Sequence, residues 1–240
     1  MLPRVILHNA VSLDGMIDGF PVDLEQYYEL VSNWKENATL AGSDTFLRAA
    51  SEAPPENDSA LLPPRVDPHD PRPILAVPDS RGRIRSWHYL RSLPYWRGFV
   101  ALCSKSTPPE YLHYLKERHI DIIIAGEDHV DLQAALLELY SRYGVKVVRV
   151  DAGGTLNGLL LSEGLVSELS VLVYPCLVSG SLAGANGGKG RSGIFVAPGR
   201  PAARSPDGSI EAIQLKLLAA EKLKGDVMWL RYEVKSREEL

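Results

Sequence analysis

The stretch of sequence that decides the fold is VVRVDAGGTLN, residues 147–157. Its first half is a β-branched run that predicts a buried parallel strand, and Gly153 and Gly154 then lead into the first turn of a helix. Glycine lets the backbone approach a ligand closely, and the free N–H groups at a helix start favour a phosphate. The alternative is a tight β-α turn that needs small residues merely for packing, because the sequence contains neither a complete G-x-G-x-x-G nor a P-loop.

Strands separated by helices extend on both sides of this junction. We expect strands at residues 5–11, 39–41, 74–77, 99–103, 120–125, 145–150 and 168–178. We expect helices that begin at Asp23, at Ser43 or Asp44, at Pro108, at about Asp131 and at Thr155. The alternating stretches 210–218 and 227–234, joined by a turn at 224–226, predict an antiparallel hairpin. The pattern therefore indicates an α/β fold, with a mostly parallel central sheet flanked by helices and a C-terminal antiparallel hairpin.

Composition limits the function classes. The 240 residues are 45% hydrophobic and 23% charged, which is typical of a globular protein, and we interpret residues 1–240 as a single domain. Its irregular parts are a Pro-rich loop at about 51–73 and a flexible Gly-rich loop at about 179–209. The net charge of −4 disfavours nucleic acid and anionic membranes as partners. Without a signal peptide or an apolar run long enough for a membrane, we expect a cytoplasmic protein.

Cysteine and histidine usage predicts no metal and no redox centre. Cys103 and Cys176 each lie inside an apolar stretch and are expected to be small buried hydrophobes. The sequence contains no His-x-Glu, no Cys-x-x-Cys and no pair of histidines four residues apart. We therefore expect no metal site.

Two further strand ends carry residues suited to a nucleotide. Gly42 and Thr45 stand where a strand meets a helix and offer N–H groups and a hydroxyl to an anion, although an ordinary helix cap explains them equally well. Ser80 and Arg81 follow another strand, and an Arg beside a hydroxyl suits a ribose 2′-phosphate. The simpler interpretation of Arg81 is a solvated turn.

The end of the first strand carries candidate catalytic groups. Asn9, Ser12 and Asp14 supply hydrogen-bond donors, acceptors and a candidate acid beside an apolar stretch. A carboxyl group shielded by apolar neighbours can have a raised pKa and donate a proton. Alternatively, Asp14-Gly15 is simply a turn.

Several short motifs in this order resemble a known family. They are Ser12-Leu13-Asp14-Gly15, Gly42-x-x-Thr45, Asp79-Ser80, Ala125-Gly126-Glu127 with Val130-Asp131-Leu132, Gly153-Gly154-Thr155-Leu156-Asn157, and Gly164 to Leu169 leading to Pro175. The sequence resembles the RibD C-terminal family, the reductase domain of riboflavin biosynthesis, which has a dihydrofolate-reductase-like fold. The resemblance covers about residues 3–180 and, through the hairpin, the chain end, and it is most specific at 145–175.

The resemblance implies an NADPH-dependent reductase, usually a homodimer, that acts on the ring-opened ribosyl group of a diaminopyrimidinone ribosylamine phosphate. It implies that NADPH contacts Gly42, Thr45, Ser80, Gly126, Val130, Gly153, Gly154, Thr155 and Leu156, with Arg81 added from the residue pattern. It also implies that Asn9, Ser12, Asp14 and Asp151 face the nicotinamide and the substrate. We assign Asp14 and Asp151 as catalytic, and Asn9, Ser12 and Glu168 as substrate-binding. Which aspartate handles the proton stays open.

Two alternatives remain at this stage. One is a reductase of the same fold for a pterin-like or dihydrofolate-like substrate. The other is a nucleotide-binding protein without catalysis, because Arg48-Ala49-Ala50 stands where stand-alone members of the family commonly have Asp-Asp-Pro, and the Gly-rich segment 179–209 has no counterpart in the family. Asp151 also stands where the family often has Glu, which shortens a substrate contact by one methylene. Turnover of NADPH with substrate would separate the last alternative from the two reductases.

Overall fold

The computed structural model describes residues 1–49, 53–64, 67, 69–178, 193–195 and 212–235. The chain divides into two compact units, which are described one at a time. Unit 1 comprises Met1–Pro3 and Glu36–Arg149, and unit 2 comprises Arg4–Lys35 and Val150–Leu240. Most of the Gly-rich stretch expected at about 179–209 lies outside the described residues.

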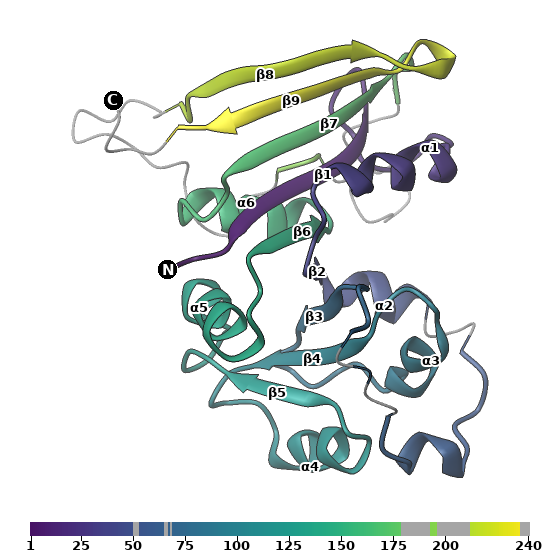
Figure 1. Cartoon of the computed structure of the whole chain (residues 1–240), viewed down its shortest axis with the longest axis vertical. Coiled ribbons are helices and arrows are strands. Elements are labelled where there is room, and N and C mark those ends of the chain that lie inside the picture. The colour runs from purple at the N-terminus through teal and green to yellow at the C-terminus, as the bar shows by residue number, and fades with distance from the viewer. Residues whose placement is uncertain (50–52, 65–66, 68, 179–192, 196–211, 236–240) are drawn as a thin grey trace, which may run out of the picture. The chain divides into compact units, whose positions relative to one another are not determined.

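Unit 1 is built on parallel strands in the order β5-β4-β3-β2 (Figure 1). Its strands are β2 (Ala38–Ala41), β3 (Ile74–Pro78), β4 (Gly98–Cys103) and β5 (Asp121–Ile124). Its helices are α2 (Ser43–Ala49), α3 (Trp87–Ser92), α4 (Pro109–Glu117) and α5 (Leu132–Tyr143), with a short 3-10 helix η3 (Asp58–Leu61). The chain leaves unit 1 within β6 (Val147–Asp151). The sequence predicts strands that alternate with helices, which favours parallel pairing. The pairings β2–β3, β3–β4 and β4–β5 are all parallel.

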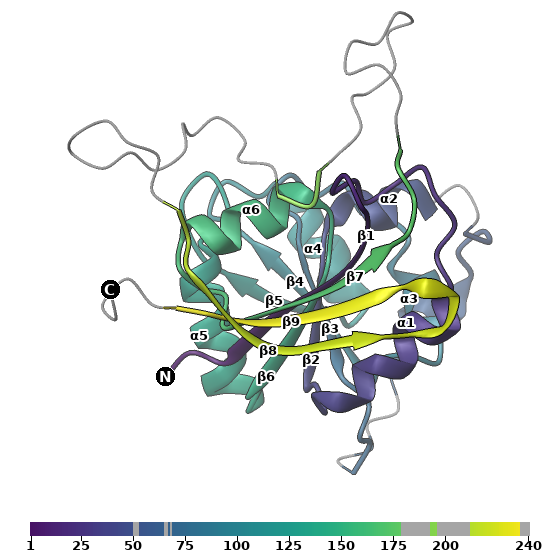
Figure 2. The same ribbon diagram turned by 90° about the horizontal axis from the view of Figure 1, so that it is seen from above.

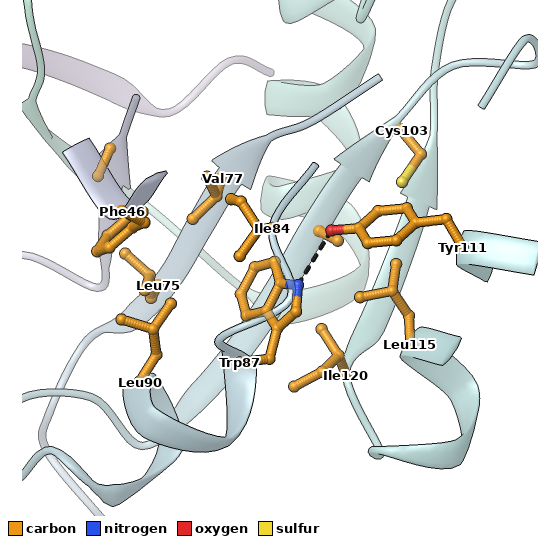
Figure 3. Close-up of a cluster of buried hydrophobic side chains, with 12 residues drawn as sticks. Phe46, Leu75, Val77, Ile84, Trp87, Leu90, Cys103, Tyr111, Leu115 and Ile120 are labelled. Carbon is orange, nitrogen blue, oxygen red and sulfur yellow. Dashed lines mark hydrogen bonds between the residues drawn. The ribbon is translucent and has the colours of Figure 1, made fainter. Parts of the chain in front are cut away.

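The core of unit 1 lies beside the turn that follows β3. Trp87 and Tyr111 are fully buried there, and the indole Nε1 of Trp87 donates a hydrogen bond of 3.0 Å to the Tyr111 hydroxyl (Figure 3). Leu75, Ile84 and Leu115 pack around this pair. Burial raises the pKa of the Tyr111 hydroxyl. The hydrogen bond joins Tyr111 on α4 to Trp87 on α3 and so holds the two helices together.

Unit 2 contains strands in the order β1-β7-β9-β8, which Figure 2 shows running side by side. They are β1 (Arg4–Ser12), β7 (Glu168–Tyr174), β9 (Met228–Val234) and β8 (Leu215–Lys222). β1 and β7 are parallel, whereas β9 pairs antiparallel with both β7 and β8. Helices α1 (Leu24–Glu29), with the 3-10 turn η1 (Leu30–Asn33), and α6 (Gly154–Ser162) belong to the same unit, and the 3-10 turn η4 (Lys224–Asp226) joins the hairpin. The expected α/β class, the parallel strands and the C-terminal hairpin are confirmed.

Some sequence-based expectations were wrong in detail. Residues 120–125 were expected to form a buried strand, but β5 is the edge of its sheet and Ile124 is 52% exposed. The helix expected from Asp23 ends early, since α1 closes at Glu29 and a 3-10 turn follows, and its Leu24 and Tyr28 are 61% and 50% exposed. β7 ends at Tyr174 rather than at residue 178, and Cys176 is only partly buried. Helix α3 was not predicted.

Candidate functional site

The start of α6 is an open helix terminus in unit 2. Gly153 is its N-cap and makes no side-chain capping hydrogen bond, and no side chain among the described residues accepts from the N–H groups of the first turn. The first hydrogen bond of the helix runs from the Asn157 N–H to the Gly153 carbonyl, at 3.3 Å. The N–H groups of residues 154–156 therefore have no partner within the helix. A Cβ at Gly153 would approach the Ile17 Cδ1 at 3.8 Å, which is ordinary contact. Gly153, Gly154, Thr155 and Leu156 therefore form a terminus that fits a phosphate.

The second predicted glycine junction, in unit 1, differs. Gly126 has a φ of +88°, and a Cβ there would lie 2.2 Å from the carbonyl oxygen of His129. The following helix, α5, is capped by its own side chain, because Asp131 Oδ1 accepts from the Ala134 N–H at 2.9 Å. Val130, also predicted to contact the cofactor, is half-buried in this turn. The Asp131 carboxylate thus already occupies one of the N–H groups of α5 that an anion would need and places a negative charge at the start of this helix.

The turn after β3 is held firmly in unit 1. Asp79 is 3% exposed, and its Oδ2 accepts from the Ile84 N–H at 2.8 Å. The Thr107 hydroxyl donates to the Ser80 carbonyl at 2.9 Å. Arg81 is exposed at the tip of this turn, and within the described residues its side chain makes no hydrogen bond or ion pair. No described residue therefore occupies the guanidinium of Arg81.

The same turn meets the start of α2. Arg83 Nη2 donates to Ser43 Oγ at 2.9 Å and to Asp44 Oδ1 at 3.1 Å. Gly42 and the exposed Thr45 flank these two residues, so the structure brings the Gly42–Thr45 segment and the Ser80–Arg81 turn together. Our sequence reasoning missed Arg83, although its place two residues after Arg81 was a signal that the turn carries two cations.

In unit 2, Ser12 and Asp14 form a compact turn after β1. The Ser12 hydroxyl donates to Asp14 Oδ1 at 2.6 Å, and the Val178 N–H donates to the same oxygen at 3.1 Å. The Met16 N–H donates to the Ser12 hydroxyl at 3.0 Å. Asp14 therefore helps to hold the chain around itself, which agrees with the turn alternative and leaves its catalytic role a prediction.

Asp151 ends β6, immediately before the open terminus of α6. The Tyr28 hydroxyl donates to Asp151 Oδ2 at 3.3 Å. Asn9, from β1, donates through Nδ2 to the carbonyl of Ala152 at 3.0 Å. Asn9 is 7% exposed and its Oδ1 accepts from Asn157 at 2.9 Å, so the protein itself occupies both ends of the Asn9 amide. The structure thus brings Asn9 and Asp151 together with the glycine junction.

Glu168 lies elsewhere in unit 2. It stands opposite Ile6 in the β1–β7 register, whereas Ser12 stands opposite Tyr174. Six residues of strand place Glu168 about 20 Å from the Ser12 end. The structure therefore does not bring Glu168 together with the other predicted substrate residues.

Glu168 is 1% exposed and surrounded by cationic and N–H donors. Its carboxylate accepts from Arg231 Nε at 2.7 Å and from Trp34 Nε1 at 3.1 Å, and it pairs with Arg4. Burial alone would raise the pKa of Glu168, but these hydrogen bonds and the charges of Arg231 and Arg4 outweigh burial and lower it. The contacts indicate a structural ion-pair cluster.

The described residues hold neither a candidate metal site nor a candidate membrane-spanning helix. They contain no group of three or more His, Cys, Asp or Glu side chains arranged to hold a metal ion. Across the same residues, no helix has both the length and the apolar character that crossing a membrane requires.

Comparisons with known proteins give consistent results. The family model described as the RibD C-terminal domain matches residues 3–192. The chain is 33% identical over 190 residues to the 2,5-diamino-6-ribosylamino-4(3H)-pyrimidinone 5′-phosphate reductase of Methanothermobacter thermautotrophicus, covering 75% of this chain and 81% of that one. It is 28% identical over 187 residues to the protein of the same name from Archaeoglobus fulgidus, covering 75% and 84%.

Solved structures share the fold at low identity. A pyrimidine reductase-like protein from Corynebacterium diphtheriae superposes with a TM-score of 0.65 at 16% identity, covering 98% of this chain and 92% of that one. The riboflavin biosynthesis reductase Rib7 of Saccharomyces cerevisiae gives a TM-score of 0.61 at 18% identity, covering 98% and 90%.

Proposed function

The chain belongs to the RibD C-terminal domain family, and from this premise we propose that it is an NADPH-dependent reductase of 2,5-diamino-6-ribosylamino-4(3H)-pyrimidinone 5′-phosphate in riboflavin biosynthesis. The observation that carries the proposal is the similarity, over most of both chains, to the reductase of that name from Methanothermobacter thermautotrophicus. The structure supports the proposal through the uncapped start of α6, whose N-cap Gly153 lies two residues after Asp151.

The cofactor assignment rests on groups that fit a dinucleotide phosphate. Gly153 leaves room beside the N–H groups at the start of α6, and we propose that these groups, with Gly154 next to them, hold the pyrophosphate. Ser80 and Arg81 would contact the 2′-phosphate, and Gly42 and Thr45 would line the same region. When bound, NADPH supplies the hydride, and the protein contributes binding, orientation and exclusion of water.

Asp151 and Asp14 are our candidates for positioning the substrate and delivering a proton. Asp151 has the better placement, because it immediately precedes the α6 junction and accepts from Tyr28. Asp14 is engaged with Ser12 and Val178, so its carboxylate has a structural task as well. We propose that Asp151 carries the larger share. Asp151→Asn should keep NADPH affinity and lose most turnover, and Asp14→Asn should lose less; the reverse ranking in steady-state assays would contradict this assignment.

The decisive experiment follows NADPH oxidation in the presence of the pyrimidinone phosphate. The native protein should turn over, and Gly153→Val should lose NADPH binding while its circular dichroism spectrum stays native. Ser162→Val, at the exposed far end of α6, is the control and should bind NADPH normally. NADPH binding without turnover would favour the non-catalytic alternative, and turnover of a dihydrofolate-like substrate instead would favour a different reductase.

The preference for NADPH over NADH tests the turn after β3. Arg81→Ala should narrow this preference, because it removes a cation with no other partner among the described residues. Arg97→Ala removes the same charge from the exposed residue just before β4 and should leave the preference for NADPH over NADH unchanged. Equal titration curves of the native protein with the two coenzymes would defeat the assignment.

We also propose a homodimer, which the family resemblance implies. Light scattering should give twice the chain mass of 26.4 kDa. A monomer that is fully active would contradict the proposed assembly.

A further inference from the structure

Asn157, on the second turn of α6, has an unusual set of contacts. It is fully buried, and its Nδ2 lies 2.9 Å from Asn9 Oδ1, 3.3 Å from the Ala152 carbonyl and 3.2 Å from the Ile194 carbonyl. All three neighbours are oxygens, so only the NH₂ end of the amide can face them. The orientation of the Asn157 side chain is therefore determined by its surroundings.

This orientation has a cost at the other end of the amide. Asn157 Oδ1 is buried and has no hydrogen-bond partner in the part of the chain that the structure describes. A buried acceptor without a partner loses its hydrogen bonds to water and gains none from the protein, which lowers stability. Such atoms are rare in folded proteins, so each one needs an explanation. A leucine of similar size would fill the space without a buried acceptor of its own, although it would take the donor away from Asn9 Oδ1 and the Ile194 carbonyl. Packing alone therefore does not account for an asparagine here.

The groups that the amide holds belong to the proposed site. The Ala152 carbonyl accepts from both Asn9 and Asn157, and Ala152 separates Asp151 from Gly153. Ile194 also donates its N–H to the Gly15 carbonyl at 3.1 Å, directly after Asp14. The Asn157 amide thus connects the turn of Asp14 with the junction that carries Asp151.

We propose that Asn157 is a positioning residue. Together with Asn9 it fixes the backbone at Ala152, and so sets the Asp151 carboxylate relative to the open N-terminus of α6. This inference rests on the proposed function, since it deepens the account of the same site. Small displacements of positioned groups reduce rates strongly, because catalysis depends on the bound geometry.

The first test separates positioning from stability. Asn157→Leu should lower kcat at least tenfold when assayed well below its melting temperature. The control is Leu160→Ala, a fully buried change on the same helix that should lower the melting temperature as much or more. Leu160→Ala should keep kcat within twofold. Equal loss of kcat in the two variants at equal loss of stability would overturn the proposal.

The second test uses the pair. Asn9→Leu combined with Asn157→Leu removes both amides, so neither is left facing an apolar partner, and the melting temperature should recover part of the loss seen in Asn157→Leu. The kcat should stay low, because nothing then holds the Ala152 carbonyl. Recovery of kcat together with the melting temperature would show a merely structural role and refute the inference.

A third measurement is independent of the reaction. Hydrogen exchange at the backbone N–H groups of residues 152–156 should accelerate at least tenfold in Asn157→Leu, and much less in Leu160→Ala. If the native protein fails to oxidise NADPH with the substrate, the proposed function falls, whereas the exchange result still decides whether Asn157 holds this segment. Unchanged exchange in Asn157→Leu would overturn the positioning role by itself.

Discussion

Two glycines that follow β-strands, Gly126 and Gly153, have the same predicted role and different surroundings. Gly126 adopts a φ of +88°, and a Cβ would lie 2.2 Å from the His129 carbonyl. Gly153 has a φ of −77°, which any residue can adopt, and its nearest contact would be Ile17 at 3.8 Å. The backbone of the chain itself requires glycine at the first position, and not at the second.

The helices after these glycines differ in the same sense. The start of α5 carries the Asp131 carboxylate as its cap, whereas the start of α6 carries no side-chain cap. A helix terminus that is already capped by an acid has less to offer a phosphate. A glycine near a strand end therefore indicates a ligand site only where backbone geometry and helix capping do not already account for it.

The largest expected effect breaks the turn at Gly126. Gly126→Ala should lower the free energy of unfolding by about 3 kcal/mol, because the Cβ combines a disfavoured φ with a steric clash. Gly144→Ala is the matched control, since Gly144 has a φ of +67° and nothing within 4 Å of a Cβ. It should lose about 1 kcal/mol in urea unfolding. Equal losses would mean that the clash at His129 is relieved by a small shift.

A smaller effect is expected at the cap of α5. Asp131→Ala should lower the free energy of unfolding by about 1 kcal/mol, because the Ala134 N–H loses its acceptor. Asp128→Ala removes the same charge from the exposed turn before α5 and should change stability by less than about 0.5 kcal/mol. Thermal unfolding of the two variants side by side tests the assignment, and a larger loss in Asp128→Ala would contradict it.

The smallest effect on stability sharpens the comparison most. Gly153→Asp gives α6 the kind of cap that α5 has, and should raise the free energy of unfolding by no more than a few tenths of a kcal/mol. NADPH affinity should nevertheless fall at least tenfold, since the carboxylate occupies the N–H groups and repels the pyrophosphate. Gly153→Asn has nearly the same shape without the charge and should fall less. Identical NADPH affinities in Gly153→Asp and Gly153→Asn would show that repulsion between the carboxylate and the pyrophosphate does not contribute.

Local chemistry made much of the fold predictable. Asp23 caps α1 by accepting from the Gln26 N–H, at the residue where the sequence predicts that this helix begins. Helix α3 was missed because it spans only Trp87–Ser92 and Ser86 makes no side-chain capping hydrogen bond. The exposure of β5 follows from its place at the edge of a sheet, and strand order is not visible in the local pattern.

The site was predictable where it follows strand ends and not where it depends on distant partners. The junction after Asp151 could be found from its glycines and the expected helix. Glu168 was predicted to bind substrate because the local sequence does not show its ion-pair partner. That partner, Arg231, lies 63 residues further along the chain. Asn157 stood within the quoted stretch, yet its contacts with Asn9 span 148 residues and had no sequence signal.

The ion-pair cluster of Glu168 has a consequence for acid tolerance. The pKa of Glu168 is lowered from 4.5, so folding releases a proton that the unfolded chain would hold below about that pH. The stability contributed by Glu168 is complete above pH 4.5 and is lost as the pH falls through the folded pKa. Acid should therefore weaken the ion pairs that Glu168, on β7, makes with Arg4 on β1 and with Arg231 on β9. Glu168→Gln should show a shallower decline of melting temperature with falling pH, and an unchanged decline would assign the acid response to other carboxyl groups.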